Sequence, residues 1–218
     1  MSQIRQFAVI GLGRFGTSLA STLEKLGHEV LALDKDESKV QKYSDSFTHV
    51  IQGDSTDESV LKAIGIRNFD CVIIAIGGDL QDNVMTTLLV KELGIKYVVA
   101  KAQNHLHGRM LEKIGADRVV YPEREMGQRV AHSLVSTTIL DFIELSPEIS
   151  ILEITAPAKV INKTLLEANL RAKYRINVLA IKRNNKIIAT PMANDMILEK
   201  DILIVMGDNK DIHELENQ

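Results

Sequence analysis

The sequence contains a single cysteine, Cys71, among its 218 residues. An intrachain disulfide is therefore impossible, and this cysteine usage fits a reducing compartment. Cys71 opens the apolar run CVIIAI, where a buried and unreactive thiol is the expected role rather than a nucleophile.

Long apolar runs and an excess of one charge are also missing. The first apolar run ends at Gly11, which is too short for the apolar core of a signal peptide followed by a cleavage site. No window approaches the ~18 continuous apolar residues of a membrane helix. With 26 basic and 29 acidic residues, the net charge of −3 gives no case for a nucleic-acid partner. We therefore expect a cytoplasmic protein with no direct membrane insertion, which reaches a membrane only through a partner.

Strand-like and helix-like segments alternate in the first half of the chain. Apolar runs at 7–10, 30–33, 49–51, 72–76, 97–100 and 118–121 predict strands, and the segments between them at 17–26, 37–43, 55–65, 82–93 and 108–114 predict helices. Ser55 and Glu58 have the spacing of a capping box at the third helix. Six strands separated by helices predict an α/β domain at 4–123, with a doubly wound parallel sheet of the Rossmann type.

The pattern changes after residue 123. Residues 126–145 form one long amphipathic stretch, which predicts a linking helix within 124–146. Beyond it, strand patterns at 151–155, 178–181, 186–190 and 202–206 are mixed with helical patterns at 165–170 and 211–216. Asn184 and Asn185 signal a hairpin between the second and third of these strands. We therefore predict a smaller α+β domain at 147–218.

A glycine motif, Gly11-x-Gly13-x-x-Gly16, directly follows the first predicted strand and precedes the first helix. In that context the motif is typical of nucleotide binding. Gly11 permits the tight turn, Gly13 lets a pyrophosphate approach the backbone, and Gly16 lets helix and strand pack closely. The N-terminus of the helix then offers unpaired N–H groups and the positive end of its dipole to phosphates.

Charged residues further restrict the class of nucleotide that the site would bind. Asp34 ends the second strand, where a carboxylate accepts both ribose hydroxyls and disfavours the 2′-phosphate of NADP. Arg14 lies inside the glycine loop, where its guanidinium can pair with a further phosphate. A plain NAD loop has no need of that cation, so Arg14 favours ATP or ADP, with a solvated arginine as the alternative.

Further candidates follow the other strands. Asp54 and Ser55 are placed to border an adenine, unless Ser55 only caps its helix. Glu123 ends the sixth strand, where its carboxylate could hold a divalent cation, Mg²⁺ or Ca²⁺, or be an ordinary surface glutamate. The predicted nucleotide site comprises Gly11, Gly13, Arg14, Phe15, Gly16, Asp34, Lys35, Asp54, Ser55, Ala75, Ile76, Gly77 and Lys101.

The sequence offers little for catalysis. Tyr97 and Lys101 match the Tyr-x-x-x-Lys spacing of short-chain reductases, but on a strand the two residues lie ~13 Å apart, whereas on a helix they would share a face. His105 and His107 lack a third metal ligand, and we predict surface or cap positions for them. We expect no enzyme: a nucleotide domain joined to a small, catalytically poor domain indicates ligand sensing. An NAD(H)-dependent redox sensor and a nicotinamide oxidoreductase stay open as alternatives.

Several longer stretches resemble the RCK (or KTN) regulatory proteins of Ktr/Trk-type potassium uptake systems over nearly the whole chain. The stretches are FAVIGLGRFG at 7–16, GDSTDE at 53–58, GIRNFD at 65–70, VAKA at 99–102, KIGAD at 113–117, YPE at 121–123, LRAKY at 170–174 and INVLAI at 176–181. The resemblance implies homodimers that assemble into an octameric ring beneath a membrane-embedded potassium-translocating subunit. It implies that ATP and ADP select different ring shapes, with the ATP-bound ring active.

Residue roles also follow from the resemblance. Arg14 matches the arginine that contacts the terminal phosphate, Asp34 the ribose carboxylate, and Glu123 the residue near a divalent cation at the dimer interface. The resemblance implies cyclic di-AMP binding in the second domain, which inactivates uptake. That site would comprise Asn169, Leu170, Arg171, Ala172, Lys173, Ile176, Asn177 and Pro191. Asn169 replaces an aspartate of some members and Arg175 a common glycine, so charge near this pocket differs.

Overall fold

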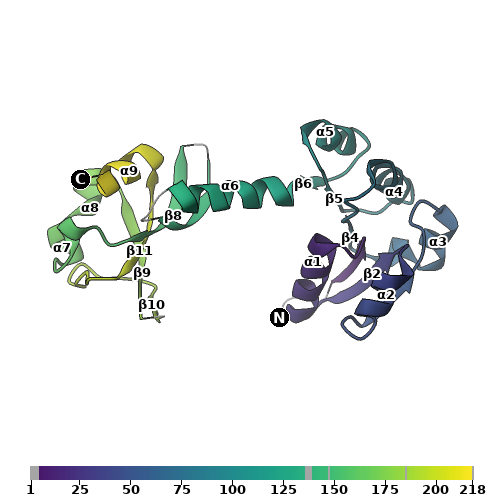
Figure 1. The fold of residues 1–218 in the computed structure, drawn as a ribbon, viewed down its shortest axis with the longest axis horizontal. Helices are drawn as coiled ribbons and strands as arrows, with labels where there is room; N and C mark the ends of the chain where they lie inside the picture. The colour runs from purple at the N-terminus through teal and green to yellow at the C-terminus, as the bar shows by residue number, and fades with distance from the viewer. Residues whose placement is uncertain (1–4, 136–138, 147, 185, 218) are drawn as a thin grey trace. The chain divides into compact units, whose positions relative to one another are not determined.

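The computed structural model describes residues 5–135, 139–146, 148–184 and 186–217. The described residues form two compact units that divide between Glu123 and Arg124. In Figure 1 the colour runs from purple to teal along the first unit and from teal through green to yellow along the second.

A six-stranded parallel sheet forms the centre of the first unit, in the order β3-β2-β1-β4-β5-β6. The strands are β1 (Gln6–Ile10), β2 (Glu29–Asp34), β3 (His49–Gln52), β4 (Cys71–Ile74), β5 (Val98–Lys101) and β6 (Arg118–Val120). The helices between them are α1 (Arg14–Lys25), α2 (Glu37–Tyr43), α3 (Glu58–Ala63), α4 (Leu80–Glu92) and α5 (His105–Lys113), with a 3-10 turn, η1 (Ile66–Asn68). The strand order reverses between β1 and β4, so the predicted doubly wound sheet is confirmed.

Apolar side chains cover both faces of this sheet. Alternate residues of a strand point to opposite faces; Ala8 and Ile10 therefore join one apolar cluster and Val9 joins another. All four residues of β4 are buried, as its continuous apolar run predicts. Cys71 is among them, and burial raises the pKa of its thiol to about 11, which keeps it protonated at neutral pH.

The predicted capping box at Ser55 is wrong. The helix α3 begins at Glu58, and its N-cap is Asp57, whose side chain accepts the N–H of Ser59. The Asp54 carboxylate accepts the N–H and the hydroxyl of Thr56, so a side-chain turn occupies the residues that the box would need.

Side-chain caps also move two other helix starts. Asp79 accepts the N–H of Asp82, so α4 begins at Leu80 instead of 82. Asn104 accepts the N–H of His107, so α5 begins three residues earlier than predicted. Polar side chains at these positions satisfy N–H groups that have no partner within the helix.

The predicted linking helix over 126–145 is corrected in its second half. The helix α6 (Pro122–Val135) begins at a proline, which suits the first helical position because it has no N–H to satisfy. A strand, β7 (Ile139–Glu144), follows it and pairs antiparallel with β8 (Ile149–Thr155). Apolar and β-branched residues at 139–143 favour a strand once a neighbouring strand is available. Residues 136–138 lie outside the described chain.

The second unit is built on a five-stranded antiparallel sheet, in the order β10-β9-β11-β8-β7. The remaining strands are β9 (Asn177–Arg183), β10 (Lys186–Ile188) and β11 (Ile202–Asp208). The helices are α7 (Leu165–Ala168), α8 (Leu170–Tyr174) and α9 (Asn209–Asn217), with a 3-10 turn, η2 (Ala158–Val160). Leu152, Leu203 and Ile212 belong to its core, so the predicted smaller α+β domain is confirmed.

The single helix predicted over 165–170 is in fact two short helices. Asn169 separates α7 from α8 with a left-handed backbone (φ 48°, ψ 44°), which asparagine tolerates better than most residues. Arg175 ends α8 in the same conformation (φ 56°). Glycine carries no steric penalty there, whereas an arginine costs about 1–2 kcal/mol.

A buried ion pair stabilises the second unit. Asp201 is 1% exposed and accepts hydrogen bonds from Nε (2.8 Å) and Nη2 (2.7 Å) of Arg183 and from the N–H of Leu198 (2.8 Å). Burial alone would raise the pKa of Asp201, but these hydrogen bonds and the charge of Arg183 hold it below its ordinary 3.8. Arg183 also donates to the carbonyl of Met196, so the pair ties β9 to the segment before β11.

We expect this pair to make the second unit acid-sensitive. Because the pKa of Asp201 is lower in the folded than in the unfolded state, its stabilisation is complete above pH ~4 and is lost as pH falls through the folded value. Asp201→Asn should lower the free energy of unfolding at pH 7 by about 2–3 kcal/mol, since it breaks a buried pair whose arginine is partly solvated. It should also flatten the loss of stability below pH 4.

Denaturant unfolding followed by circular dichroism between pH 2.5 and 7 measures both effects. Glu199→Gln is the matched control, because Glu199 is exposed and two residues away. An equal destabilisation in the two variants would contradict the buried-pair explanation.

Candidate nucleotide-binding site

A cavity of about 460 Å³ lies at the carboxyl ends of the strands in the first unit. In open α/β sheets this edge holds ligands where the strand order reverses, and the volume suits a nucleotide-sized molecule. Of the thirteen residues predicted to bind nucleotide, all but Gly16 line the cavity. The further lining residues are Ile10, Leu33, Lys39, Gly53, Gly78, Asp79, Asp82 and Glu123.

Each glycine of the loop meets a different constraint. Gly11 has φ +103°, in the region that favours glycine, and its missing Cβ would lie 3.0 Å from the backbone of Ala75. A Cβ at Gly16 would lie 1.9 Å from the carbonyl oxygen of Gly11, so this glycine serves helix–loop packing. Gly13 has an extended backbone and no atom within 4 Å of a Cβ, which leaves open space beside the start of α1.

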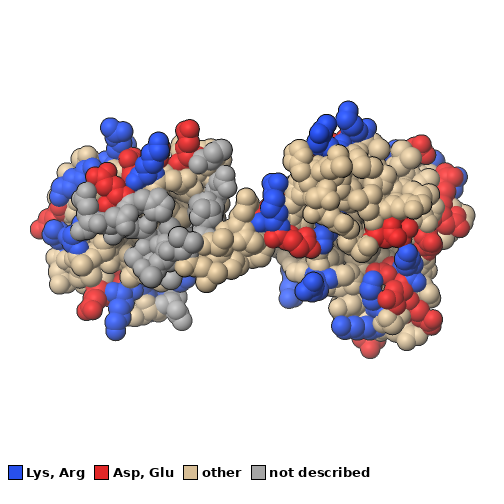
Figure 2. All heavy atoms as spheres, turned by 45° about the horizontal axis from the view of Figure 1, so that its top comes forward, with Lys and Arg blue, Asp and Glu red and all other residues tan. Residues whose placement is uncertain are grey.

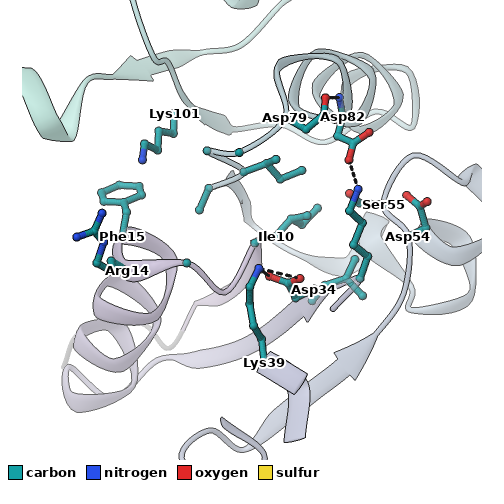
Figure 3. Close-up of a pocket in the computed structure, with 18 of the residues that line it drawn as sticks. Ile10, Arg14, Phe15, Asp34, Lys39, Asp54, Ser55, Asp79, Asp82 and Lys101 are labelled. Carbon is teal, nitrogen blue, oxygen red and sulfur yellow. Dashed lines mark hydrogen bonds and ion pairs between the residues drawn. The ribbon is translucent and has the colours of Figure 1, made fainter. Parts of the chain in front are cut away.

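The carboxylate of Asp34 accepts several hydrogen bonds within the protein that the sequence does not predict. Its Oδ2 accepts the N–H of Leu12 (2.6 Å), and its Oδ1 accepts the N–H of Asp36 (2.9 Å). Lys39 Nζ contacts both oxygens, at 3.1 and 3.3 Å (Figure 3). A carboxylate offers about four acceptor positions, and these contacts fill them, so a further donor would reach Asp34 only if Lys39 moved away. The side chain of Lys39 is 41% exposed.

Positive charge gathers where the cavity meets the glycine loop. Arg14 is the first residue of α1, and Lys101 at the end of β5 lies beside it across the ring of Phe15 (Figure 3). Lys101 Nζ is 6.0 Å from the Phe15 ring centroid and pairs with the carboxylate of Glu123. Two cations at a helix N-terminus provide a site for anionic phosphates.

Negative charge gathers at the opposite end. Lys35 forms an ion pair with Asp82, and Asp54 and Asp79 lie close enough to add to its field. The hydrogen bond to Asp82 and the surrounding carboxylates raise the pKa of Lys35. Hydrogen bonds from the Thr56 hydroxyl and N–H lower the pKa of Asp54, which is therefore ionised and accepts hydrogen bonds only. The cavity is thus polarised: its loop end suits phosphates, and its acidic end suits a base that donates from an amino group (Figure 3).

Glu123 lies at the rim of the cavity, where its pKa is lowered by the hydrogen bond from Lys101 and by the charge of Arg14. Within the part of the chain that the structure describes, no three His, Cys, Asp or Glu side chains gather into a group that could hold a metal ion. A cation at Glu123 therefore needs ligands besides the described His, Cys, Asp and Glu side chains of this chain.

A buried amide that no sequence motif marks supports this edge of the sheet. Asn83 is fully buried, and its Nδ2 donates to the carbonyls of Ile76 (2.7 Å) and Lys101 (3.0 Å), which ties the ends of β4 and β5 together. Gln103 donates to the carbonyl of Gly77 (2.7 Å). Both residues follow apolar strands at no recognised motif spacing, so only the folded sheet identifies them.

The residues considered for catalysis are separated or buried. Tyr97 precedes β5 and is exposed, whereas Lys101 ends the strand inside the cavity, so the reductase pairing is absent from this fold. His105 is exposed, as predicted. His107 corrects the prediction of a surface or cap position, because it is 1% exposed and accepts the N–H of Gln103 through Nδ1. Burial lowers the pKa of His107 and keeps it neutral.

Seven of the eight residues matched to a cyclic di-AMP site lie within one segment of the second unit, 169–177. Leu170 and Ile176 are buried in its core, whereas Arg171, Ala172 and Lys173 on α8 are exposed. The segment runs from the left-handed Asn169 to Asn177 at the start of β9, and Pro191 lies beyond β10. Two buried apolar anchors thus hold a short helix that exposes two cations.

Comparisons with known proteins identify the family of both units. The TrkA-N domain model matches residues 7–122, and the TrkA-C domain model matches residues 149–218. The chain is 50% identical over 214 residues to Ktr system potassium uptake protein C of Bacillus subtilis, covering 98% of this chain and 97% of the relative. The chain belongs to the RCK family of Ktr-type regulatory subunits. Ktr system potassium uptake protein A of the same organism is 48% identical, with 98% and 96% covered.

A solved RCK structure shares the fold. The RCK domain of GsuK matches with a TM-score of 0.70 at 21% identity, covering 99% of this chain and 47% of that one. The GsuK channel bound to NAD matches at 0.53 and 24% identity over 99% of this chain and 38% of that one. The ADP-bound form of GsuK matches with a TM-score of 0.52 at 21% identity, covering 58% of this chain and 34% of that one.

The glycines of the RCK loop should separate stability from binding. Gly16→Ala should cost about 2–3 kcal/mol of the free energy of unfolding, because its Cβ meets a backbone oxygen that cannot yield easily. Gly13→Ala should leave stability within about 0.5 kcal/mol, because its Cβ enters open space, yet it should weaken nucleotide binding by crowding the phosphates. Thermal unfolding and calorimetric titration with ADP test the pair; equal stability of the two variants would contradict the assigned roles.

Proposed function

We propose that this chain is the regulatory subunit of a potassium uptake system and that it senses ATP and ADP in the cavity of its first unit. The observation that carries the proposal is the polarised cavity: Arg14 and Lys101 flank the glycine loop, and Asp34 lies one strand away. Charge-assisted hydrogen bonds from two cations and a helix N-terminus favour a chain of phosphates at that end.

The loop end of the cavity favours a mononucleotide over NAD(H). Beyond the glycine loop, the cavity is bounded by Phe15 and by the Lys101–Glu123 pair. A charged pair suits a terminal phosphate and its counterion better than a neutral nicotinamide ring. GsuK has been solved with NAD and with ADP, so the shared fold by itself is compatible with either ligand.

The charged side chains around the cavity suit binding rather than catalysis. Three lysines lining the cavity pair with Asp34, Asp82 and Glu123, and Asp54 is held by Thr56. An efficient general acid or base has a pKa near the working pH, and the pKa shifts of Lys35, Asp54 and Glu123 all lead away from neutral pH. Ligand binding without chemistry changes a protein by differential affinity for its conformations, which is what a regulatory subunit requires.

The rest of the proposal rests on the Ktr relatives and the resemblance. We place the chain in the cytoplasm, at the inner face of the membrane, as homodimers in an octameric ring on a membrane potassium-translocating subunit. None of the described helices is both long and apolar enough to cross a bilayer. Arg171 and Lys173 on α8 would contact the phosphates of cyclic di-AMP, and Glu123 would share Mg²⁺ or Ca²⁺ with residues of a second copy.

A thermal-shift panel separates the candidate ligands. A ligand present at ~100 times its Kd adds ~2.7 kcal/mol of stability. We expect ATP, ADP and cyclic di-AMP each to raise the melting temperature by several degrees, because each binds only the folded chain. If NADH alone stabilised the protein, the redox-sensor alternative would replace this proposal.

Arg14→Ala tests the terminal-phosphate role. Removing one charge-assisted hydrogen bond should weaken ATP about tenfold and ADP threefold or less, since ADP lacks the group that Arg14 would reach. Arg109→Ala, an exposed arginine on α5, is the matched control and should change neither Kd. Isothermal titration with both nucleotides provides the two ratios, and equal losses for ATP and ADP would show that Arg14 does not distinguish them.

A further inference from the structure

One ion pair of the cavity joins two elements on opposite sides of the crevice. Lys35 is the first residue after β2, and Asp82 lies in the first turn of α4, which follows β4. The pair therefore links the end of β2 to the helix that follows β4, with β1 between these two strands in the sheet, and both residues line the cavity. It lies at the acidic end of the cavity, beside Asp54 and Asp79 and opposite the glycine loop.

The other cations of the cavity have different places. Lys39 is held on Asp34, at the ribose position, and Arg14 and Lys101 lie at the loop end (Figure 3). Lys35 is the cation at the acidic end among the described lining residues, where Asp82 binds its ammonium and the charges of Asp54 and Asp79 add to the attraction.

The chemistry of a lysine suits this position. Its four methylenes form an apolar stem that covers flat, apolar surface while the ammonium stays hydrated or paired. A cation held over a π-face is also attracted by the ring itself. While its ammonium is bound to Asp82, the stem of Lys35 lies across the crevice instead of extending into solvent.

We infer that Lys35 and Asp82 form a strap over the base of the bound nucleotide, with Lys35 as the covering residue and Asp82 as the positioning residue. The inference rests on the proposed function, since it requires an adenine nucleotide in this cavity. The side chains are 61% and 22% exposed, so the strap opens and closes readily. A nucleotide leaves when the pair breaks, and the strap therefore affects the dissociation rate.

The test is the dissociation rate of tritiated ADP from the full chain, after dilution into an excess of unlabelled ADP. Asp82→Asn and Lys35→Met should each release ADP two- to fivefold faster, the range expected of a partly exposed ion pair. The double variant should be no faster than either single one, because both break the same contact. Lys35→Arg, which preserves the stem and the charge, should stay within twofold of the unchanged protein.

Two controls and the salt dependence exclude general charge effects. Glu37→Gln, in the first turn of α2, and Lys42→Met, later in the same helix, alter charge outside the cavity and should leave the rate unchanged. Salt weakens exposed ion pairs. The ratio of the ADP dissociation rates of variant and unchanged protein should therefore fall toward one as NaCl is raised from 50 mM to 1 M.

The outcomes distinguish the strap from the function it rests on. If the unchanged chain binds ADP and the variants release it at the same rate, or if the two single effects multiply in the double variant, the strap is overturned while the nucleotide site stands. If the unchanged chain binds neither ATP nor ADP, the proposed function itself fails.

Discussion

The first unit depends on one buried hydrogen bond, from the N–H of Leu12 to the carboxylate of Asp34 at 2.6 Å. It joins the glycine loop after β1 to the end of β2. Gly11 takes its positive φ within the same turn, and its N–H donates to the carbonyl of Leu33. The loop therefore has a fixed shape before any ligand arrives, and a preorganised loop loses little entropy when phosphates bind.

The fixed glycine loop determines where the two charged ends of the cavity lie. The loop directs the start of α1, and with it Arg14, toward the side where β5 brings Lys101. On the other side, Asp34 is followed at once by Lys35, which reaches α4. Opposite charges at the two ends orient a ligand whose phosphates and base differ in charge and in hydrogen-bond donors, so binding and orientation come from the same few residues.

Much of the first unit could be predicted from the sequence because its signals are local. Apolar runs mark buried parallel strands, and the carboxyl ends of those strands meet at one edge, which places Asp34, Asp54 and Lys101 around one cavity. The glycine spacing reports backbone geometry directly. Gly16 does not line this cavity, and its place in the motif predicts a role in helix–strand packing instead.

The rest depends on contacts that no short motif encodes. Asp82 and Lys39 enter the cavity because their helices pack at a particular rotation on the sheet. Ser55 has the spacing of a capping box, but the N-cap of α3 is Asp57. The sequence at 139–143 predicts a helix, but antiparallel pairing with β8 makes this segment a strand. Tertiary pairing overrides local pattern in each case.

The most direct test is a crystal structure of the chain grown with ADP. We predict the two phosphates of ADP at the glycine loop, beside Gly13 and the N-terminus of α1, and a ribose hydroxyl hydrogen-bonded to Asp34 with Lys39 displaced and the N–H of Leu12 still bound. An ADP molecule outside this cavity, or one that leaves the Asp34–Lys39 pair intact and untouched by ribose, would contradict the account.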